Sequence, residues 1–325
     1  MRAQKQYGMT LIELMVALAI GAFLMIGAIT VFMQSRTSFR VTESLSRLQE
    51  NGRFALEVLE ADVRMANYWG LNTVTSTVAN RAAPTAPAFP GIAHPCGNNW
   101  AVNLDQAVQG SNNSYTWACP GTAPVEVTAD TLVVRRASED VVVPVLGGLH
   151  IQSVRGTSDS QIFVGAMPPA GFNPLTSETH RLLATGYYVS RSSALGANIP
   201  SLRMHSLQPG GGMALNQELI AGVEDMQIQF GVDTNLPGQP GRGSVDRYVN
   251  PNDPMITPGA PGFNANAVVL SVRIWLRVRA ERIENGFVDN VVYNYAGQNF
   301  GPFNDAFRRL VVSKTIYLRN ARPNS

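Results

Sequence analysis

The chain has 325 residues, of which 45% are hydrophobic and 15% charged, with 29 glycines and 20 prolines. This composition excludes a disordered chain and is typical of a globular protein with short strands and many turns. The formal charge is +2, and no basic patch is concentrated in one place, so the sequence argues against a nucleic-acid partner.

The first element is an apolar segment behind a short basic leader. No charged residue occurs from 14 to 33, and a helix of that length spans about 30 Å, the thickness of a hydrocarbon core. The segment is longer than the apolar core of a secretory signal, and no small-residue cleavage site follows it. Arg2 and Lys5 precede it, which places the leader in the cytoplasm and the rest of the chain outside.

A helical pattern continues from 34 to 68. Its small and aliphatic residues recur at spacings of three and four, which predicts an amphipathic helix. No proline occurs before Trp69. We therefore expect one helix over residues 9–68, membrane-spanning at 9–33 and amphipathic at 34–68, with its second half buried on a downstream domain. The stripe consists of Leu45, Leu48, Gly52, Ala55, Leu59, Val63 and Ala66.

Residues 69–325 predict a β-rich globular domain. Gly, Pro, Asn and Ser are frequent in the first part of this region, which indicates loops. Strand patterns follow further along the chain. In the clearest one, VVLSVRIWLRVRAER, Val272 and Ile274 alternate with Arg273 and Trp275. Such alternation is typical of an antiparallel sheet with one face in water. The predicted fold class is α+β, with a long N-terminal helix packed on a β-rich antiparallel head.

Cys96 and Cys119 lie in the same loop-rich region of this domain. In an exported chain we expect them to form one disulfide, which contributes about 3 kcal/mol to stability in the chain-entropy model. Two buried free thiols are the alternative.

The sequence contains no recognisable catalytic motif. His94, His150, His180 and His205 are scattered without metal-ligand spacing and are interpreted as ordinary surface or loop histidines. There is no G-x-S-x-G, no P-loop and no G-x-G-x-x-G after a strand. We therefore expect a protein that is not an enzyme.

One polar loop, GVDTNLPGQPGRGSVDRYVNPNDP, contains Asp233, Asn235 and Asp246. These residues resemble an interrupted calcium loop with oxygen ligands. A polar hairpin loop without metal is the alternative. No other cofactor is expected.

The residues Gly8-Met9-Thr10-Leu11-Ile12-Glu13-Leu14 resemble the type IV prepilin signature. This resemblance implies cleavage between Gly8 and Met9 by a prepilin peptidase on the cytoplasmic face. It also implies methylation of the new N-terminus at Met9, where the family usually has phenylalanine. The fold it implies is pilin-like.

Glu13 would be costly in the bilayer unless it were paired. Cleavage creates an ammonium group on Met9, and the ammonium of a neighbouring subunit could pair with Glu13 as helices pack in a filament. Glu13 would then set the register of assembly. Gly21 and Gly27 would permit close helix contacts.

Three further segments, ADVRMANYWG, LIAGVEDMQIQFGVD and FRRLVVSKTIYLRNARP, are similar to the PilW-type minor pilins of type IV pilus assembly. The resemblance implies a single-pass protein of the inner membrane with a periplasmic C-terminal domain, later incorporated in the extracellular pilus. It implies a role in priming the filament near its tip, and hence in twitching motility and cell adhesion.

The partners implied are other minor pilins, the major pilin, the inner-membrane assembly platform, membrane lipid and a tip adhesin. A minor pseudopilin of a type II secretion system is the alternative, because pseudopilins share the N-terminal motif and a β-rich head. A membrane-anchored periplasmic enzyme or ligand-binding module is a third hypothesis.

Overall fold

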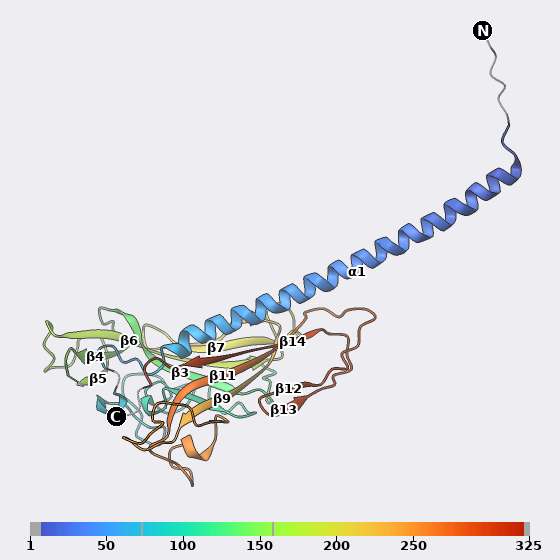
Figure 1. Ribbon diagram of the computed structural model, residues 1–325. Helices are drawn as coiled ribbons and strands as arrows, with labels where there is room; N and C mark the ends of the chain where they lie inside the picture. Colours follow the sequence, from blue (N-terminus) through green and yellow to red (C-terminus); the bar gives the residue numbers. More distant parts are fainter. Residues whose placement is uncertain (1–7, 73, 158, 322–325) are drawn as a thin grey trace. The chain divides into compact units, whose positions relative to one another are not determined.

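A computed structural model describes residues 8–72, 74–157 and 159–321 (Figure 1). Most of the expected leader, including Arg2 and Lys5, lies outside the described residues, as does the end of the terminal segment at 322–323. The chain forms two compact units, Met1–Arg47 and Leu48–Ser325. The boundary between them falls within a single helix, α1 (Leu11–Arg64).

Helix α1 ends at Arg64 rather than at residue 68. Asn67 has a left-handed φ of 66°, a conformation that terminates helices and that asparagine tolerates better than most residues. Its backbone N–H donates to the carbonyl of Arg135 at 3.3 Å. A hydrogen bond to a strand therefore replaces the next helical bond and directs the chain into the head.

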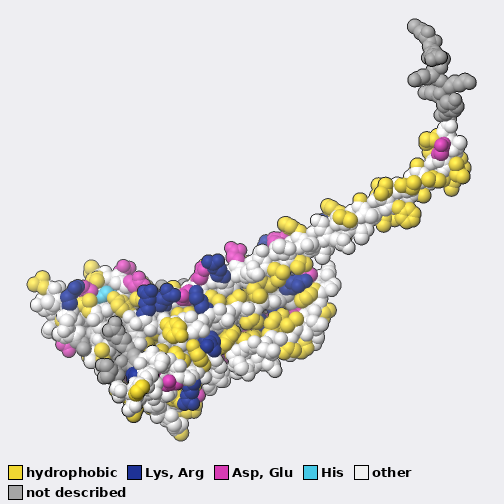
Figure 2. Space-filling view, viewed as in Figure 1, with side chains coloured by type: hydrophobic (Ala, Val, Ile, Leu, Met, Phe, Trp, Pro, Cys, Tyr) yellow, Lys and Arg dark blue, Asp and Glu magenta, His cyan; other side chains and the backbone are white. Residues whose placement is uncertain are grey.

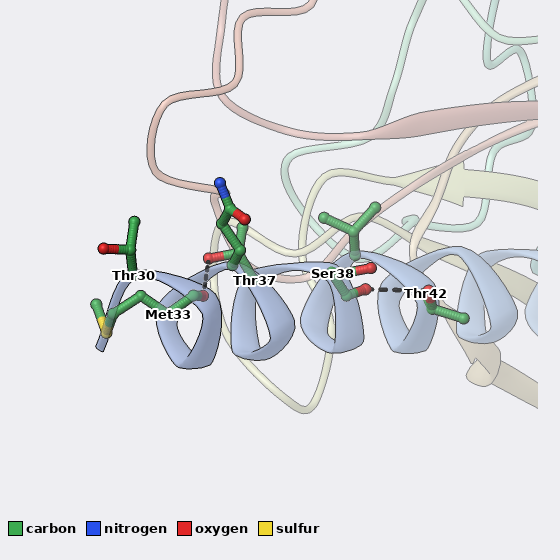
Figure 3. A pocket seen from close by; sticks show the side chains of 7 residues that line it. Thr30, Met33, Thr37, Ser38 and Thr42 are labelled. Carbon is green, nitrogen blue, oxygen red and sulfur yellow. Dashed lines mark hydrogen bonds between the residues drawn. The ribbon is translucent and has the colours of Figure 1, made fainter. Parts of the chain in front are cut away.

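Within the first unit, the large apolar side chains from Leu11 to Met33 are exposed. By length and composition α1 contains a stretch that could cross a membrane. Further along, one helix face lines a shallow pocket in which Thr37 and Thr42 donate to the carbonyls of Met33 and Ser38 (Figure 3). These hydroxyls are thus satisfied within the helix. The pocket is lined by Thr30, Met33, Gln34, Thr37, Ser38, Val41 and Thr42.

The second unit is a head with two main sheets. The larger has the strand order β1-β5-β4-β6-β3-β2, and β7 and β8 extend it from β6. All of its pairs are antiparallel except the short pair of β1 with β5. The strands are β1 (Val78–Ala79), β2 (Val108–Ser111), β3 (Thr131–Val141), β4 (Leu149–Val154), β5 (Ser160–Val164), β6 (Ser177–Ser190), β7 (Ser201–Leu207) and β8 (Met213–Ala221).

The smaller sheet is antiparallel, with the order β10-β9-β11-β14. A separate hairpin, β12 with β13, lies in the connection between β11 and β14. In the described part of the head, three short 3-10 helices interrupt the loops. These elements are β9 (Val223–Asp233), β10 (Arg247–Val249), β11 (Val268–Arg279), β12 (Tyr293–Tyr295), β13 (Gln298–Phe300), β14 (Arg309–Tyr317), η1 (Thr75–Thr77), η2 (Leu104–Gln106) and η3 (Pro254–Ile256).

The α1 segment from Leu48 onward and both sheets share one hydrophobic core. Its members come from α1, from β3 and β6 of the larger sheet, and from β9 and β11 of the smaller one. This arrangement confirms the predicted α+β class, in which a long N-terminal helix is followed by a β-rich head with antiparallel sheets. The core includes Ala55, Leu56, Leu59, Val63, Leu132, Val134, Tyr187, Met226, Ile228, Phe230, Val272, Ile274 and Leu276.

The alternation expected in β11 is present, but its second face is not uniformly wet. Val272 and Ile274 are fully buried in the core, and Arg273 and Trp275 on the other face are partly exposed. Arg277 on that face is only 6% exposed. The expectation of one face in water is wrong at this end of the strand, because residues of the segment 280–308 contact Arg277.

Gly52 allows α1 to approach the smaller sheet closely. A Cβ at this position would lie 2.9 Å from Cγ2 of Val312 and 3.3 Å from Cγ2 of Val278. Overpacking of a close contact typically costs about 1–3 kcal/mol. We therefore predict that Gly52→Leu lowers the free energy of unfolding by that amount.

Urea denaturation of the full chain in detergent micelles, followed by tryptophan fluorescence, measures this effect. The neighbouring exposed position supplies the matched control, Arg53→Leu, for which we expect little change in stability. Equal stability of the Gly52→Leu and Arg53→Leu variants would contradict the observed packing.

Candidate functional site

Glu13 closes the first turn of α1 onto Thr10. Its Oε2 accepts the backbone N–H of Thr10 at 2.9 Å and the Thr10 hydroxyl at 2.8 Å. The Thr10 hydroxyl oxygen in turn accepts the backbone N–H of Glu13 at 3.4 Å. This is a capping box, in which two groups that a helix start leaves unpaired satisfy each other. The sequence pattern T-x-x-E signals it, but the expectation for Glu13 considered only a neighbouring subunit.

The expected processing site lies directly before this capping box. Gly8 and Met9 are exposed and precede the helix, and no atom of the described residues lies within 4 Å of where a Gly8 Cβ would stand. A peptidase could therefore reach the bond between them in extended chain. Cleavage there and methylation of Met9 remain predictions.

A buried carboxylate attaches the second part of α1 to the larger sheet. Asp62 accepts Nε of Arg136 at 2.6 Å and the hydroxyl of Tyr187 at 3.0 Å. Breaking a buried pair of this kind by removing one partner typically costs about 3–5 kcal/mol. The apolar stripe gave no indication of this contact, because a carboxylate on a helix is ordinarily read as solvent-facing.

Strand β14 and the residues that follow it contact the C-terminal part of α1. The backbone N–H of Arg319 donates to the carbonyl of Arg64 at 3.1 Å, and the Asn67 side chain donates to the carbonyl of Asn320 at 2.8 Å. Lys314 of β14 forms an ion pair with Glu60 of α1. Contacts from both sheets therefore hold the part of α1 from Leu48 to Arg64 against the head.

The two cysteines, Cys96 and Cys119, are joined in a disulfide. It belongs to a second core cluster, which also contains the buried rings of Trp69 and Trp100. The disulfide links the loop before β2 to the loop after it, and both loops precede β3. Its position suits a structural role in the head.

The histidines at 150, 180 and 205 are at most 1% exposed and lie on strands β4, β6 and β7. Their interpretation as surface or loop residues is therefore wrong, and only His94 lies in a loop. A histidine gives no reliable signal of burial because its imidazole can be satisfied by protein groups as well as by water. The described residues contain no group of three or more His, Cys, Asp or Glu that could hold a metal ion.

A chain of hydrogen bonds fixes the tautomer of the buried His205. Its Nδ1 accepts the backbone N–H of Asn216 at 3.1 Å, so Nε2 carries the proton and donates to the Tyr115 oxygen at 2.9 Å. The Tyr115 hydroxyl donates onward to the carbonyl of Cys119 at 2.7 Å. Burial lowers the pKa of His205 to about 4.

The three residues of the expected calcium loop come together only in part. Asn235 donates to Asp246 at 3.1 Å, and Asp246 also accepts the backbone N–H of Thr234 at 2.7 Å. Asp233 is buried and accepts the backbone N–H of Gly243 at 2.6 Å. Each carboxylate is already occupied by protein donors, which suits a loop held by its own hydrogen bonds rather than a set of converging oxygen ligands. Calcium binding stays a prediction.

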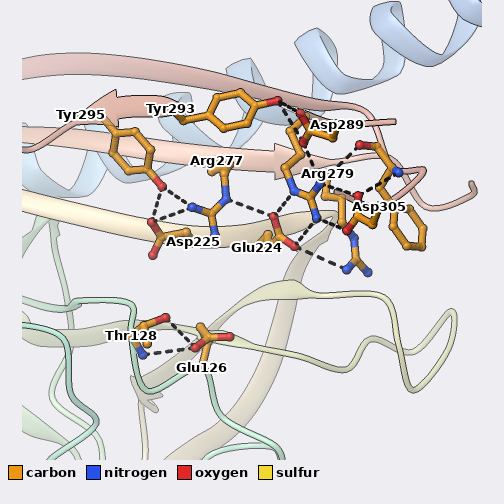
Figure 4. Close-up of polar contacts among 12 residues, drawn as sticks. Glu126, Thr128, Glu224, Asp225, Arg277, Arg279, Asp289, Tyr293, Tyr295 and Asp305 are labelled. Atoms are coloured by element: carbon orange, nitrogen blue, oxygen red, sulfur yellow. Dashed lines mark hydrogen bonds and ion pairs between the residues drawn. The ribbon is translucent and has the colours of Figure 1, made fainter. Parts of the chain in front are cut away.

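A buried charge cluster closes one end of the smaller sheet (Figure 4). Glu224 accepts from Arg277 at 3.0 Å and from Arg309 at 2.7 Å, and Arg309 also donates to Asp289 at 2.8 Å. Burial alone would raise the pKa of Glu224, but the hydrogen bond from Arg309 and the charge of Arg277 bring it below its ordinary value. Because Asp289 belongs to the connection between β11 and β14, the cluster binds that connection to the sheet.

Comparisons with known proteins match two parts of the chain, its N-terminal segment and the second half of its head. A family model described as Type IV Pilus-assembly protein W matches residues 186–320, from the end of β6 past β14. A model of the prokaryotic N-terminal methylation motif matches residues 3–29. The chain thus combines an N-terminal methylation motif with a PilW region. The resemblance to a type IV pilus minor pilin is thereby confirmed, and the methylation motif lies where the sequence signature places it.

A solved structure, the type IV-like pilin TTHA1219 from Thermus thermophilus, is similar at 13% identity over 87% of this chain and 99% of that chain. Its TM-score of 0.36 is too low to support a conclusion. No curated protein matches the chain.

The neutral state of His205 makes stability depend on pH. Its folded pKa of about 4 lies below its ordinary value of 6.5, so the unfolded chain binds a proton first as the pH falls. The contribution is complete above pH 6.5 and is lost on acidification toward pH 4. Between pH 7 and pH 5 the loss amounts to about 2 kcal/mol.

We predict that the wild-type chain loses this stability between pH 7 and pH 5 in urea denaturation, and that His205→Phe abolishes that part of the pH dependence. The comparison uses the slope of the free energy of unfolding against pH. It is therefore independent of any uniform change in stability that the substitution causes. Identical slopes for the wild type and the variant would show that His205 protonates freely in the folded head.

Proposed function

We propose that this chain is a minor pilin that primes type IV pilus assembly together with other minor pilins, near the tip of the filament. The observation that carries the proposal is the presence, in one chain, of the methylation motif at 3–29 and the PilW region at 186–320. The first feature supports processing and membrane insertion of a pilin. The second distinguishes the head from a generic membrane-anchored domain.

The proposed sequence of events begins in the inner membrane. The apolar part of α1 holds the chain as a single-pass protein, a prepilin peptidase removes residues 1–8, and Met9 becomes the methylated N-terminus. The head lies on the periplasmic side until the chain enters the extracellular pilus. Further partners would be the major pilin, the assembly platform and a tip adhesin.

Glu13 would have a different role before and after assembly. In the single chain it accepts from Thr10, so its charge has local partners while it is surrounded by lipid. In the filament, the ammonium of a neighbouring Met9 would supply a full opposite charge. A neighbour out of register would leave both charges unpaired in an apolar surrounding, which is costly.

The pilin matches point to a structural component of a pilus rather than to an enzyme. The side chains described above are engaged in capping, packing and ion pairing. A structural role therefore accounts for the helix end, the Asp62 contact and the charge cluster without any chemical step.

The test is a Glu13→Ala substitution in the chromosomal copy. We predict normal amounts of the chain in the inner membrane, because the apolar helix remains, together with a marked loss of surface pili and twitching motility. Thr10→Ala is the matched control, since it removes the Thr10 hydroxyl from the capping box but leaves the Glu13 charge. We expect its piliation to exceed that of Glu13→Ala.

Secretion of exoproteins by a type II system is measured in the same strains. Loss of pili with intact secretion supports the pilus. Intact pili with lost secretion would assign the chain to a type II secretion system as a pseudopilin. Normal piliation and normal secretion in Glu13→Ala would contradict a register role for this charge.

A further inference from the structure

We propose that the outer face of the smaller sheet is a docking surface for a segment of another protein subunit that presents a carboxylate to Arg273. We call it the arginine–aromatic face. The proposal rests on the proposed function in one respect only: it takes that subunit to be a component of the pilus. The face consists of Gln229, Tyr248, Arg273, Trp275, Thr315 and Tyr317.

The strand registers place these side chains together. Arg273 of β11 lies opposite Gln229 of β9 and Thr315 of β14, and its neighbours Val272 and Ile274 point into the core. Its side chain therefore stands on the face turned away from the core. On the face of the head that Figure 2 displays, basic and hydrophobic side chains are interspersed.

Two rings hold the Arg273 guanidinium in place. Its central carbon lies 3.7 Å from the ring centroid of Tyr248 and 5.7 Å from that of Trp275. Its Nε donates to the hydroxyl of Thr315 at 3.2 Å. The guanidinium is thus oriented by stacking and by one hydrogen bond. Its terminal nitrogens have no hydrogen-bond partner among the described residues, so their donors are left for another group.

Two other arginines on the same face of β11 have a carboxylate partner, which Arg273 lacks. Arg277 and Arg279 both pair with Glu224, at 3.0 Å and 3.4 Å, and the cluster around them is covered by residues of the segment 280–308 (Figure 4). Within the described parts of the chain, Arg273 has no carboxylate within ion-pairing distance. Strand β11 therefore carries two arginines whose charges are paired and covered. The third, Arg273, has an oriented guanidinium but no ion-pair partner among the described residues.

The chemistry of the surrounding residues identifies the kind of partner. The cross-strand neighbours of Arg273 and Trp275 on this face are Gln229, Gln227, Thr315 and Ser313, all of them neutral. A nucleic acid or another polyanion requires several cations side by side. A single oriented guanidinium between aromatic rings instead fits one carboxylate, bound through two parallel hydrogen bonds. Tyrosine, tryptophan and arginine are the residues that dominate the energy of protein–protein interfaces.

The accessible part of the face extends to the edge of the sheet. Strand β14 is the last strand and pairs only with β11 among the described strands. Ser313 is exposed, and Tyr317 is 64% exposed. A partner bound to Arg273 would therefore contact exposed side chains of the edge strand β14 rather than a loop that covers them.

The test uses the full chain in cells that assemble pili, with a photo-reactive benzoylphenylalanine in place of Ser313. We expect an adduct with another pilus subunit whose crosslinked peptide, identified by mass spectrometry, contains Asp or Glu. Arg273→Gln should lower the yield of this adduct by about tenfold. Arg247→Gln, at an exposed arginine of β10, is the matched control and should leave the yield unchanged.

Exchange of the two charges makes the test specific. Arg273→Glu combined with substitution of the partner's acidic residue by Arg should restore the adduct. No adduct from Ser313, an adduct unaffected by Arg273→Gln, or an adduct with a second copy, nucleic acid or polysaccharide would overturn the proposal. If pili form while the adduct is absent, the docking surface is wrong and the proposed function stands, because Glu13 tests that function separately.

Discussion

The packing of α1 from Leu48 onward against both sheets of the head is the interaction on which the rest of the structure depends. Gly52 lets the helix approach the smaller sheet, and Asp62 ties it to the larger one through Arg136 and Tyr187. The shared core would be open to water without this helical segment, because each sheet turns an apolar face toward it. This helical segment therefore joins the two sheets into one packed head.

Charge is used in two ways in the head. Near Glu224, several arginines and carboxylates are buried together, and each removal would leave an uncompensated charge. Their role is to hold the long connection between β11 and β14 against the sheet. At Arg273 the orienting rings are present but the described residues supply no counter-charge. In the proposed docking surface, the same kind of side chain that serves stability at one end of the strand would serve recognition at the other.

The sequence predicted features whose cause is local or periodic. The stripe from Leu48 to Val63 and the alternation in β11 follow from which face meets the core, and the structure has both. The T-x-x-E pattern at Thr10 was equally readable. By contrast, the burial of Asp62 and His205 depends on partners 74 and 11 residues away. No local pattern marks such pairings, nor the covering of Arg277 by the segment 280–308.

We propose that α1 is a processed pilin helix that carries this head into a filament. This proposal is tested most directly by mass spectrometry of the chain in pili sheared from the cell surface. We predict an N-terminal peptide that starts at N-methylated Met9. Absence of the chain from sheared pili while it accumulates in the membrane, or peptides that still join residues 1–8 to Met9, would contradict it.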